Sequence, residues 1–182
     1  MIAMRPLRRS VAALVAALAA TAASAAPALA IEPTSDRLEL TKMTGRWYEV
    51  ARLPNKIQKD CQAATSDWKK AADGFAVVQT CHKGAPGGPT TEWKAKAQVA
   101  NPGANTRLKM SFFGGLVNQE YWVLEHRPDQ GWLLLGTPSG RGLWLMSTRP
   151  TLSQNVLSQA VARVRQLGYD TNRLEFPQPA RN

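Results

Sequence analysis

The stretch Gly45-Arg46-Trp47-Tyr48-Glu49-Val50-Ala51-Arg52 decides how this chain of 182 residues should fold. Gly45 lets the chain turn sharply at the start of a strand, because glycine has no Cβ to restrict its backbone. Trp47, two residues later, is large enough to plug one end of a barrel. About a hundred residues of short alternating strands follow, and then one amphipathic helix. This order indicates a container for an apolar molecule rather than an enzyme.

Apolar and polar residues alternate in eight short runs, which is the period of a half-buried strand. In the fourth run Trp93 and Ala95 share one face while Lys94 and Lys96 take the other, and glycine-containing turns separate the runs. Eight consecutive strands without intervening helices predict an all-β fold, an eight-stranded up-and-down antiparallel barrel that leaves no free sheet edge. The expected strands are 46–52, 62–69, 75–82, 91–99, 107–113, 120–127, 132–136 and 142–148.

After the last strand the apolar residues change to helical spacing, over residues 152–167. Thr151 with Gln154 predicts a capping box at the start of this C-terminal helix, and Gly168 predicts its end. We expect the helix to pack its apolar stripe on the outside of the barrel. Residues 173–176 are expected to add a last short strand.

Residues 1–30 have the pattern of a cleaved signal peptide. Arg5, Arg8 and Arg9 precede an Ala/Leu/Val segment, and Ala28-Leu29-Ala30 fits the small-residue cleavage rule, with Ala23-Ser24-Ala25 as a second possible site. An uncleaved anchor is less favoured, because the apolar run is short for a membrane span of about 20 residues. No cysteine lies at the cleavage site, so we expect no lipid anchor there. The pattern predicts one domain, residues 31–182, in the periplasm or secreted.

The predicted domain is basic, with 20 Lys+Arg against 13 Asp+Glu, a formal charge of +7. Its longest basic block is Lys69-Lys70, so the sequence lacks the clustered basic face of nucleic-acid-binding modules. We therefore expect no nucleic-acid partner. A basic surface favours anionic ligands or peripheral contact with an anionic membrane.

The two cysteines, Cys61 and Cys81, lie on either side of a predicted hairpin. In an exported protein such a pair is more often a disulfide than a metal or redox site. A symmetric hairpin would place Cys61 opposite a residue beyond Cys81, so the bond needs a bulge or a diagonal offset. The alternative is a free catalytic thiol. The base nearest in sequence, His82, follows Cys81 and so lies on the opposite strand face.

With these residues the chain resembles the lipocalin family, most closely its bacterial branch. The G-x-W motif of the family matches Gly45-Arg46-Trp47, and the resemblance covers about residues 38–176. Three more segments, followed by a proline-led helix at Pro150, are similar to those of the bacterial branch: Ser111-Phe112-Phe113-Gly114, Asn118-Gln119-Glu120-Tyr121-Trp122-Val123-Leu124 and Leu143-Trp144-Leu145-Met146-Ser147. Biotin-binding barrels share a turn like G-x-W but lack the C-terminal helix. The four segments and the helix together are therefore more specific for lipocalins than the G-x-W motif alone.

The chain departs from the family pattern in two places. The family usually has an arginine directly after that serine, stacked over the motif tryptophan. Here Thr148 occupies the position and Arg149 follows, so Arg149 reaches Trp47 only if the strand bulges. The better-known bacterial members are outer-membrane lipoproteins, and this chain has no cysteine at its predicted cleavage site.

The resemblance implies that the barrel binds and carries a small hydrophobic ligand, of the fatty acid or lysophospholipid type. Residues 53–60 would then cover the open end, where Arg52 and Lys56 either meet an anionic headgroup or stay solvated. Barrel geometry lets alternating side chains face inward, as ligand contacts or equally as ordinary core. These candidates are Trp93, Ala95, Ala97, Leu108, Met110, Phe112, Tyr121 and Val123.

Three alternatives stay open at this point. Some lipocalin relatives use a strand cysteine for isomerase chemistry, which here requires a free Cys61. A tetrapyrrole or haem carrier would use His82 or His126 as axial ligand, and a structural envelope protein would bind partners through its surface. The sequence shows no paired carboxylates and no metal-ligand spacing, so we expect no enzyme activity, metal or cofactor. Both a monomer and a homodimer are compatible with it.

Overall fold

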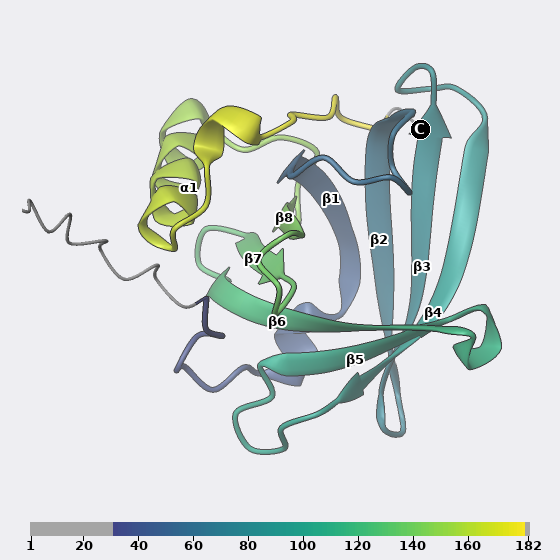
Figure 1. Ribbon diagram of the computed structural model, residues 1–182, viewed down its shortest axis with the longest axis vertical. Helices are drawn as coiled ribbons and strands as arrows, with labels where there is room; N and C mark the ends of the chain where they lie inside the picture. The colour runs from purple at the N-terminus through teal and green to yellow at the C-terminus, as the bar shows by residue number, and fades with distance from the viewer. Residues whose placement is uncertain (1–30, 181–182) are drawn as a thin grey trace, which may run out of the picture.

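The computed structural model, which describes residues 31–180, is a closed barrel of eight antiparallel strands (Figure 1). Each strand pairs with its neighbours in sequence, and β8 closes on β1, so the predicted up-and-down barrel is confirmed. The predicted strand ends differ from the observed ones by at most three residues. The strands are β1 (Gly45–Arg52), β2 (Cys61–Ala71), β3 (Gly74–Lys83), β4 (Thr90–Val99), β5 (Arg107–Phe112), β6 (Val117–Arg127), β7 (Trp132–Gly136) and β8 (Leu143–Ser147). The predicted signal peptide, 1–30, lies outside the described residues.

The up-and-down order places the loops alternately at the two ends of the barrel. The β1–β2 loop (residues 53–60, the mouth loop), the β3–β4 loop (84–89), the β5–β6 loop (113–116) and the β7–β8 loop (137–142) share one end, which we call the mouth. The other three hairpin turns share the opposite, closed end with the 3₁₀ helix η1 (Leu40–Met43).

The closed end is sealed by apolar packing around Trp47. Its ring is 2% exposed, and its Nε1 donates a hydrogen bond to the Met43 carbonyl oxygen at 2.9 Å. Leu38 and Met43 are also buried there. Gly45 starts β1 at φ +104°, a left-handed conformation that a side chain would disfavour.

Apolar residues pack on both sides of the barrel wall. One cluster fills the interior and includes Trp47, Phe75 and Met110. A second lies on the outer face of β6, β7, β8 and β1, where the helix α1 (Gln154–Gln166) packs Ala160 and Val164 against the sheet. The C-terminal helix therefore lies outside the barrel, as predicted, and Figure 1 shows it on one side only.

The ends of the C-terminal segment differ from the prediction in two respects. The helix is capped by Ser153, whose Oγ accepts a hydrogen bond from the Val156 amide. The prediction of a capping box that starts at Thr151 was therefore wrong. Ser153 has the extended backbone of an N-cap and directly precedes the first helical residue. Gly168, at φ +90°, follows the helix end as expected. The predicted strand at 173–176 is reduced to a single bridge between Arg52 and Glu175, after the 3₁₀ turn η3 (Thr171–Arg173).

Candidate ligand-binding site

A cavity of about 70 Å³ lies inside the barrel, just beneath the mouth loop. Its wall combines aromatic rings with amide and hydroxyl groups, so it suits an amphipathic rather than a purely apolar ligand. The lining residues are Asn55, Ile57, Gln58, Ala64, Thr65, Ser66, Trp68, Gln79, Thr80, Trp93, Tyr121, Leu135, Trp144 and Met146.

Aromatic residues on facing strands shape this cavity. The rings of Tyr121 on β6 and Trp144 on β8 lie 5.2 Å apart between centroids. Trp93 on β4 and Trp68 on β2 complete the aromatic wall. Burial raises the pKa of Tyr121 to about 12, with a smaller contribution from the charge of Glu49. Its hydroxyl is therefore neutral and able to donate a hydrogen bond at physiological pH.

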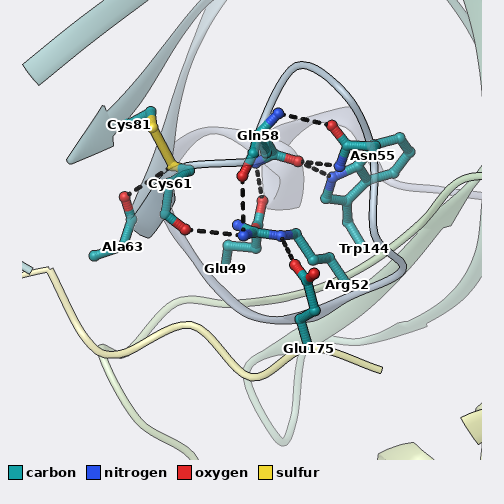
Figure 2. The surroundings of a disulfide bond; sticks show 9 residues. All are labelled: Glu49, Arg52, Asn55, Gln58, Cys61, Ala63, Cys81, Trp144 and Glu175. Atoms are coloured by element: carbon teal, nitrogen blue, oxygen red, sulfur yellow. Dashed lines mark hydrogen bonds and ion pairs between the residues drawn. A yellow bond between two sulfur atoms is a disulfide. The ribbon is translucent and has the colours of Figure 1, made fainter. Parts of the chain in front are cut away.

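The mouth loop is held against β1 and β8, at the edge of the cavity, by the side chain of Gln58 (Figure 2). Its Oε1 accepts hydrogen bonds from Asn55 Nδ2 at 2.7 Å and from Trp144 Nε1 at 2.9 Å, and its Nε2 donates to Glu49 Oε2 at 2.7 Å. One side chain thus joins the loop to β1 and β8. The contacts that hold the loop over this side of the cavity are therefore polar.

Beneath the loop lies a buried ion pair between Arg52 and Glu49, exposed by only 4% and 5% (Figure 2). Arg52 Nη1 donates to Glu49 Oε1 at 2.7 Å, and its other donors reach Glu175 Oε2 and the Cys61 carbonyl, both at 2.8 Å. Burial raises the pKa of Glu49, and Arg52 and Gln58 partly offset this. Neither expectation for Arg52 holds, since it is not solvated and its donors are occupied. Lys56 is exposed.

A disulfide joins Cys61 to Cys81, with a Cα–Cα distance of 5.5 Å. The sequence required a bulge or a diagonal offset, and both are present: the β2–β3 register shifts between Cys61 and Ala63, and Cys61 pairs with Lys83 rather than with Cys81. Cys61 directly follows the mouth loop, so the bond fixes the end of that loop to β3 (Figure 2). These are the two cysteines of the chain, and the isomerase alternative therefore lacks its free thiol.

The structure brings only part of the predicted ligand-binding set to the cavity. Trp93 and Tyr121 line it. The other six candidates are buried in the interior cluster and do not line this cavity: Ala95, Ala97, Leu108, Met110, Phe112 and Val123. Their contact with a ligand stays a prediction.

Sequence reasoning missed the polar part of the site, above all Gln58 and Asn55. Nothing in the local sequence marks a loop glutamine as a cavity closure. Strand alternation does place Trp144 and Met146 on one face of β8, and Ser66 and Trp68 on one face of β2. Applying the same alternation to every strand would have predicted these four residues as inward-facing candidates for the cavity wall.

Arg149 is exposed, and β8 ends before it at Ser147 without a bulge in its pairing to β7. The aromatic neighbour of Trp47 is instead His126, with ring centroids 6.3 Å apart. Within residues 31–180 the cation–π contact is formed by Arg107 over Trp122, not by Arg149 over Trp47.

The candidate haem ligands lie away from the cavity. Neither His82 nor His126 lines it, and His126 lies at the closed end beside Trp47. Burial lowers the pKa of His126. In the described part of the chain, no cluster of three or more His, Cys, Asp or Glu side chains could hold a metal ion, and no helix has the length and apolarity to cross a membrane.

Comparison with known proteins identifies the family. The model of the lipocalin-like domain matches residues 38–179. The chain belongs to the lipocalin family. Similarity to the outer membrane lipoprotein Blc of Vibrio cholerae, 31% identical over 150 residues that cover 82% of this chain and 86% of that protein, places it in the bacterial branch.

More distant relatives share the fold. Temperature-induced lipocalin-1 of Arabidopsis thaliana is 27% identical, over 75% of this lipocalin and 77% of the plant protein. Among solved structures, insecticyanin from the tobacco hornworm Manduca sexta superposes with a TM-score of 0.64 at 16% identity, covering 81% of this chain and 84% of that one. The amine-binding protein of Rhodnius prolixus, solved with tryptamine, gives 0.60 at 16% identity, with the same two coverages. Lipocalins are in general binding proteins rather than enzymes.

Proposed function

We propose that this lipocalin binds and carries a small hydrophobic ligand with a polar head, of the fatty acid or lysophospholipid type, at the mouth of its barrel. The observation that carries the proposal is the aromatic cavity beneath a loop held by hydrogen bonds. The similarity to the outer membrane lipoprotein Blc supports a role in the cell envelope.

The size of the cavity requires the mouth loop to move. About 70 Å³ holds at most a few water molecules, whereas ligand sites are typically about 300–1,000 Å³. An acyl chain therefore enters only when the loop swings away and side chains in the upper barrel rearrange. The two neutral hydrogen bonds of Gln58 are worth only about 0.5–1.5 kcal/mol net each, because water replaces them when the loop opens, and the one to the Glu49 carboxylate about 1.5–3 kcal/mol.

Apolar burial is of the size needed to offset the cost of association and of this opening. An acyl chain of about 15 methylenes gains roughly 12 kcal/mol when buried, at about 0.8 kcal/mol each. Association costs an estimated 4–15 kcal/mol, to which the loop opening adds a small amount. Binding therefore depends more on the apolar chain than on the head, and the protein accepts several acyl ligands.

We assign the polar contact to Tyr121. Its neutral hydroxyl lies among the cavity residues and can donate a hydrogen bond to the carboxylate or phosphate of a ligand. Trp93 and Trp144 provide flat apolar surfaces for the first methylenes. Arg52 does not bind the head, because Glu49, Glu175 and a carbonyl occupy its donors.

We also propose that the protein works after export, in the periplasm or outside the cell. The pattern of residues 1–30 supports removal of a signal peptide, and a disulfide persists in such oxidising compartments. N-terminal sequencing of the protein from its native host tests this: the mature chain should begin at Ile31.

The ligand is tested by mass spectrometry of lipids that co-purify with the protein from its native host, followed by displacement of a fluorescent fatty-acid probe. We expect acyl lipids, and about tenfold weaker probe binding by Trp93→Ala, which removes part of the cavity wall. Trp122→Ala is the matched control, because that half-buried tryptophan packs on the outer face of the barrel. Absence of acyl lipids together with no probe displacement would contradict the proposal.

A further inference from the structure

The tip of the β5–β6 hairpin, residues 113–117, presents apolar side chains to solvent. Phe113 is 57% exposed, Leu116 87% and Val117 46%. These are three of the five large hydrophobic side chains that are exposed in the described chain. A soluble surface scatters such residues singly, whereas three within five positions mark a site of interaction.

The backbone holds this tip in an unfavourable conformation. Phe113, Gly114 and Gly115 have φ values of +51°, +69° and +100°. Glycine adopts these angles freely, but a phenylalanine in the left-handed region is strained, and such strain concentrates at functional sites. The turn separates two adjacent aromatic residues: Phe112 is buried in the barrel, and Phe113 points outward.

Positive charge lies beside the tip. Gly114 and Gly115 border a hollow of about 520 Å³ on the outer wall of β3 and β4, which Lys94 and Lys96 also line. Both lysines are exposed, and within residues 31–180 neither forms an ion pair. The tip thus combines an apolar end with two adjacent lysines, beside which the exposed Glu92 of β4 is the one carboxylate on the same strand face.

The tip lies at the mouth end of the barrel, and the other mouth loops have a similar character. Ile57 of the mouth loop is 73% exposed. The mouth loops, together with the adjoining Lys83, contain four cationic side chains and one carboxylate, Asp60. The cations are Lys56, Lys59, Lys83 and Arg141. Figure 1 shows the β5–β6 hairpin extending on the side of the molecule away from α1, so the helix does not cover it.

We propose that the β5–β6 tip docks this protein on a bilayer that contains anionic phospholipid. Phe113, Leu116 and Val117 insert among the acyl chains, while Lys94 and Lys96 meet the phosphates of the headgroups. A second copy of the chain fits the tip less well, because a stable dimer buries about 800 Å² per partner and this tip is a five-residue turn. The inference is independent of what the cavity holds.

The test is co-sedimentation of the full exported protein with vesicles of phosphatidylcholine, with and without phosphatidylglycerol. We expect binding only to the anionic vesicles, and less of it at high salt. Phe113→Asn with Leu116→Ser should bind at least about tenfold more weakly. Asparagine tolerates the left-handed conformation, so the melting temperature should not fall. Lys94→Gln with Lys96→Gln should weaken binding by about 25-fold, at about fivefold for each lysine.

Phe176→Asn is the matched control. Phe176 is 53% exposed, but it borders a hollow on α1, on the side of the molecule away from the β5–β6 hairpin (Figure 1), and this variant should bind vesicles like the unchanged protein. All variants should bind the fatty-acid probe normally, which separates docking from the cavity function. Three results would overturn the proposal: no sedimentation of the unchanged protein with anionic vesicles, equal sedimentation of the tip variant, or a dimer that the tip substitutions dissociate without any vesicle binding.

Discussion

The two ends of the barrel are both shut, but by different interactions. At the closed end Trp47 is packed among Leu38, Met43 and the interior residues, with one hydrogen bond from its indole. At the mouth Gln58 holds the loop to β1 and β8 through amide hydrogen bonds, beside the buried pair of Arg52 and Glu49. Opening the closed end would expose apolar surface to water and lose the full free energy of its burial. Opening the mouth breaks hydrogen bonds that water can replace, so the net cost is smaller.

This difference makes the mouth the end that can open. The mouth loop is anchored at both ends, by Arg52 before it and by the disulfided Cys61 after it, so its middle can move without unfolding the barrel. At the closed end the residues that cover the barrel, Trp47, Leu38 and Met43, are themselves part of the interior core. The comparison predicts that substitutions at the closed end act on stability, and those at the mouth on ligand exchange.

The largest effect is expected from Trp47→Ala. Removing a fully buried indole leaves a cavity and should lower the free energy of unfolding by about 3–5 kcal/mol. Urea unfolding followed by circular dichroism measures it. If the loss were smaller than that caused by substitutions in the mouth loop, packing at Trp47 would not be what seals the closed end.

A smaller loss of stability, with a gain in exchange, is expected from Gln58→Ala. The substitution removes two neutral side-chain hydrogen bonds and one to the Glu49 carboxylate, and should destabilise the protein by about 2–3 kcal/mol. Stopped-flow measurement should show faster association of the fluorescent fatty-acid probe, because the loop opens more often. Lys56→Ala, an exposed position in the same loop, is the control and should change neither quantity. An unchanged association rate in Gln58→Ala would mean that the loop does not limit entry.

The smallest effect concerns pH and His126 at the closed end. Burial lowers the pKa of this imidazole, so the unfolded chain takes up its proton more readily than the folded one. The stability contributed by neutral His126 is present above the unfolded pKa of about 6.5 and is lost as the pH falls below it. Melting temperatures at pH 7.5 and pH 5 should therefore differ less in His126→Gln. An equal difference in both proteins would place the titrating group elsewhere.

Much of the fold followed from short-range patterns. The alternation of Trp93, Ala95 and Ala97 against Lys94 and Lys96 set the inward face of β4, and the same period set the other strands. Strand alternation is readable because each side chain points opposite to the next. The spacing of Cys61 and Cys81 predicted the disulfide and the bulge or diagonal offset that it needs.

The candidate site was less predictable. Trp93 and Tyr121 were expected at the cavity, but Gln58 joins residues distant in sequence, with Trp144 lying 86 positions away. Arg52 was expected either to meet an anionic headgroup or to stay solvated, and only the packing of Glu49 and Glu175 around it explains its burial. Such contacts depend on which loop packs over which strand in the folded barrel. The local sequence of one segment does not contain this information.

The sequence by itself determined a closed antiparallel barrel, an outer helix, a disulfide and membership of the lipocalin family, because period, turn residues and motifs are local properties of the chain. Only the tertiary structure decided how much of the interior is hollow, which end is held by polar contacts, and that Phe113 points outward while Phe112 is buried. The reason is physical: side-chain volumes fill a barrel jointly, and a buried charge or an exposed ring is defined only by its neighbours in space.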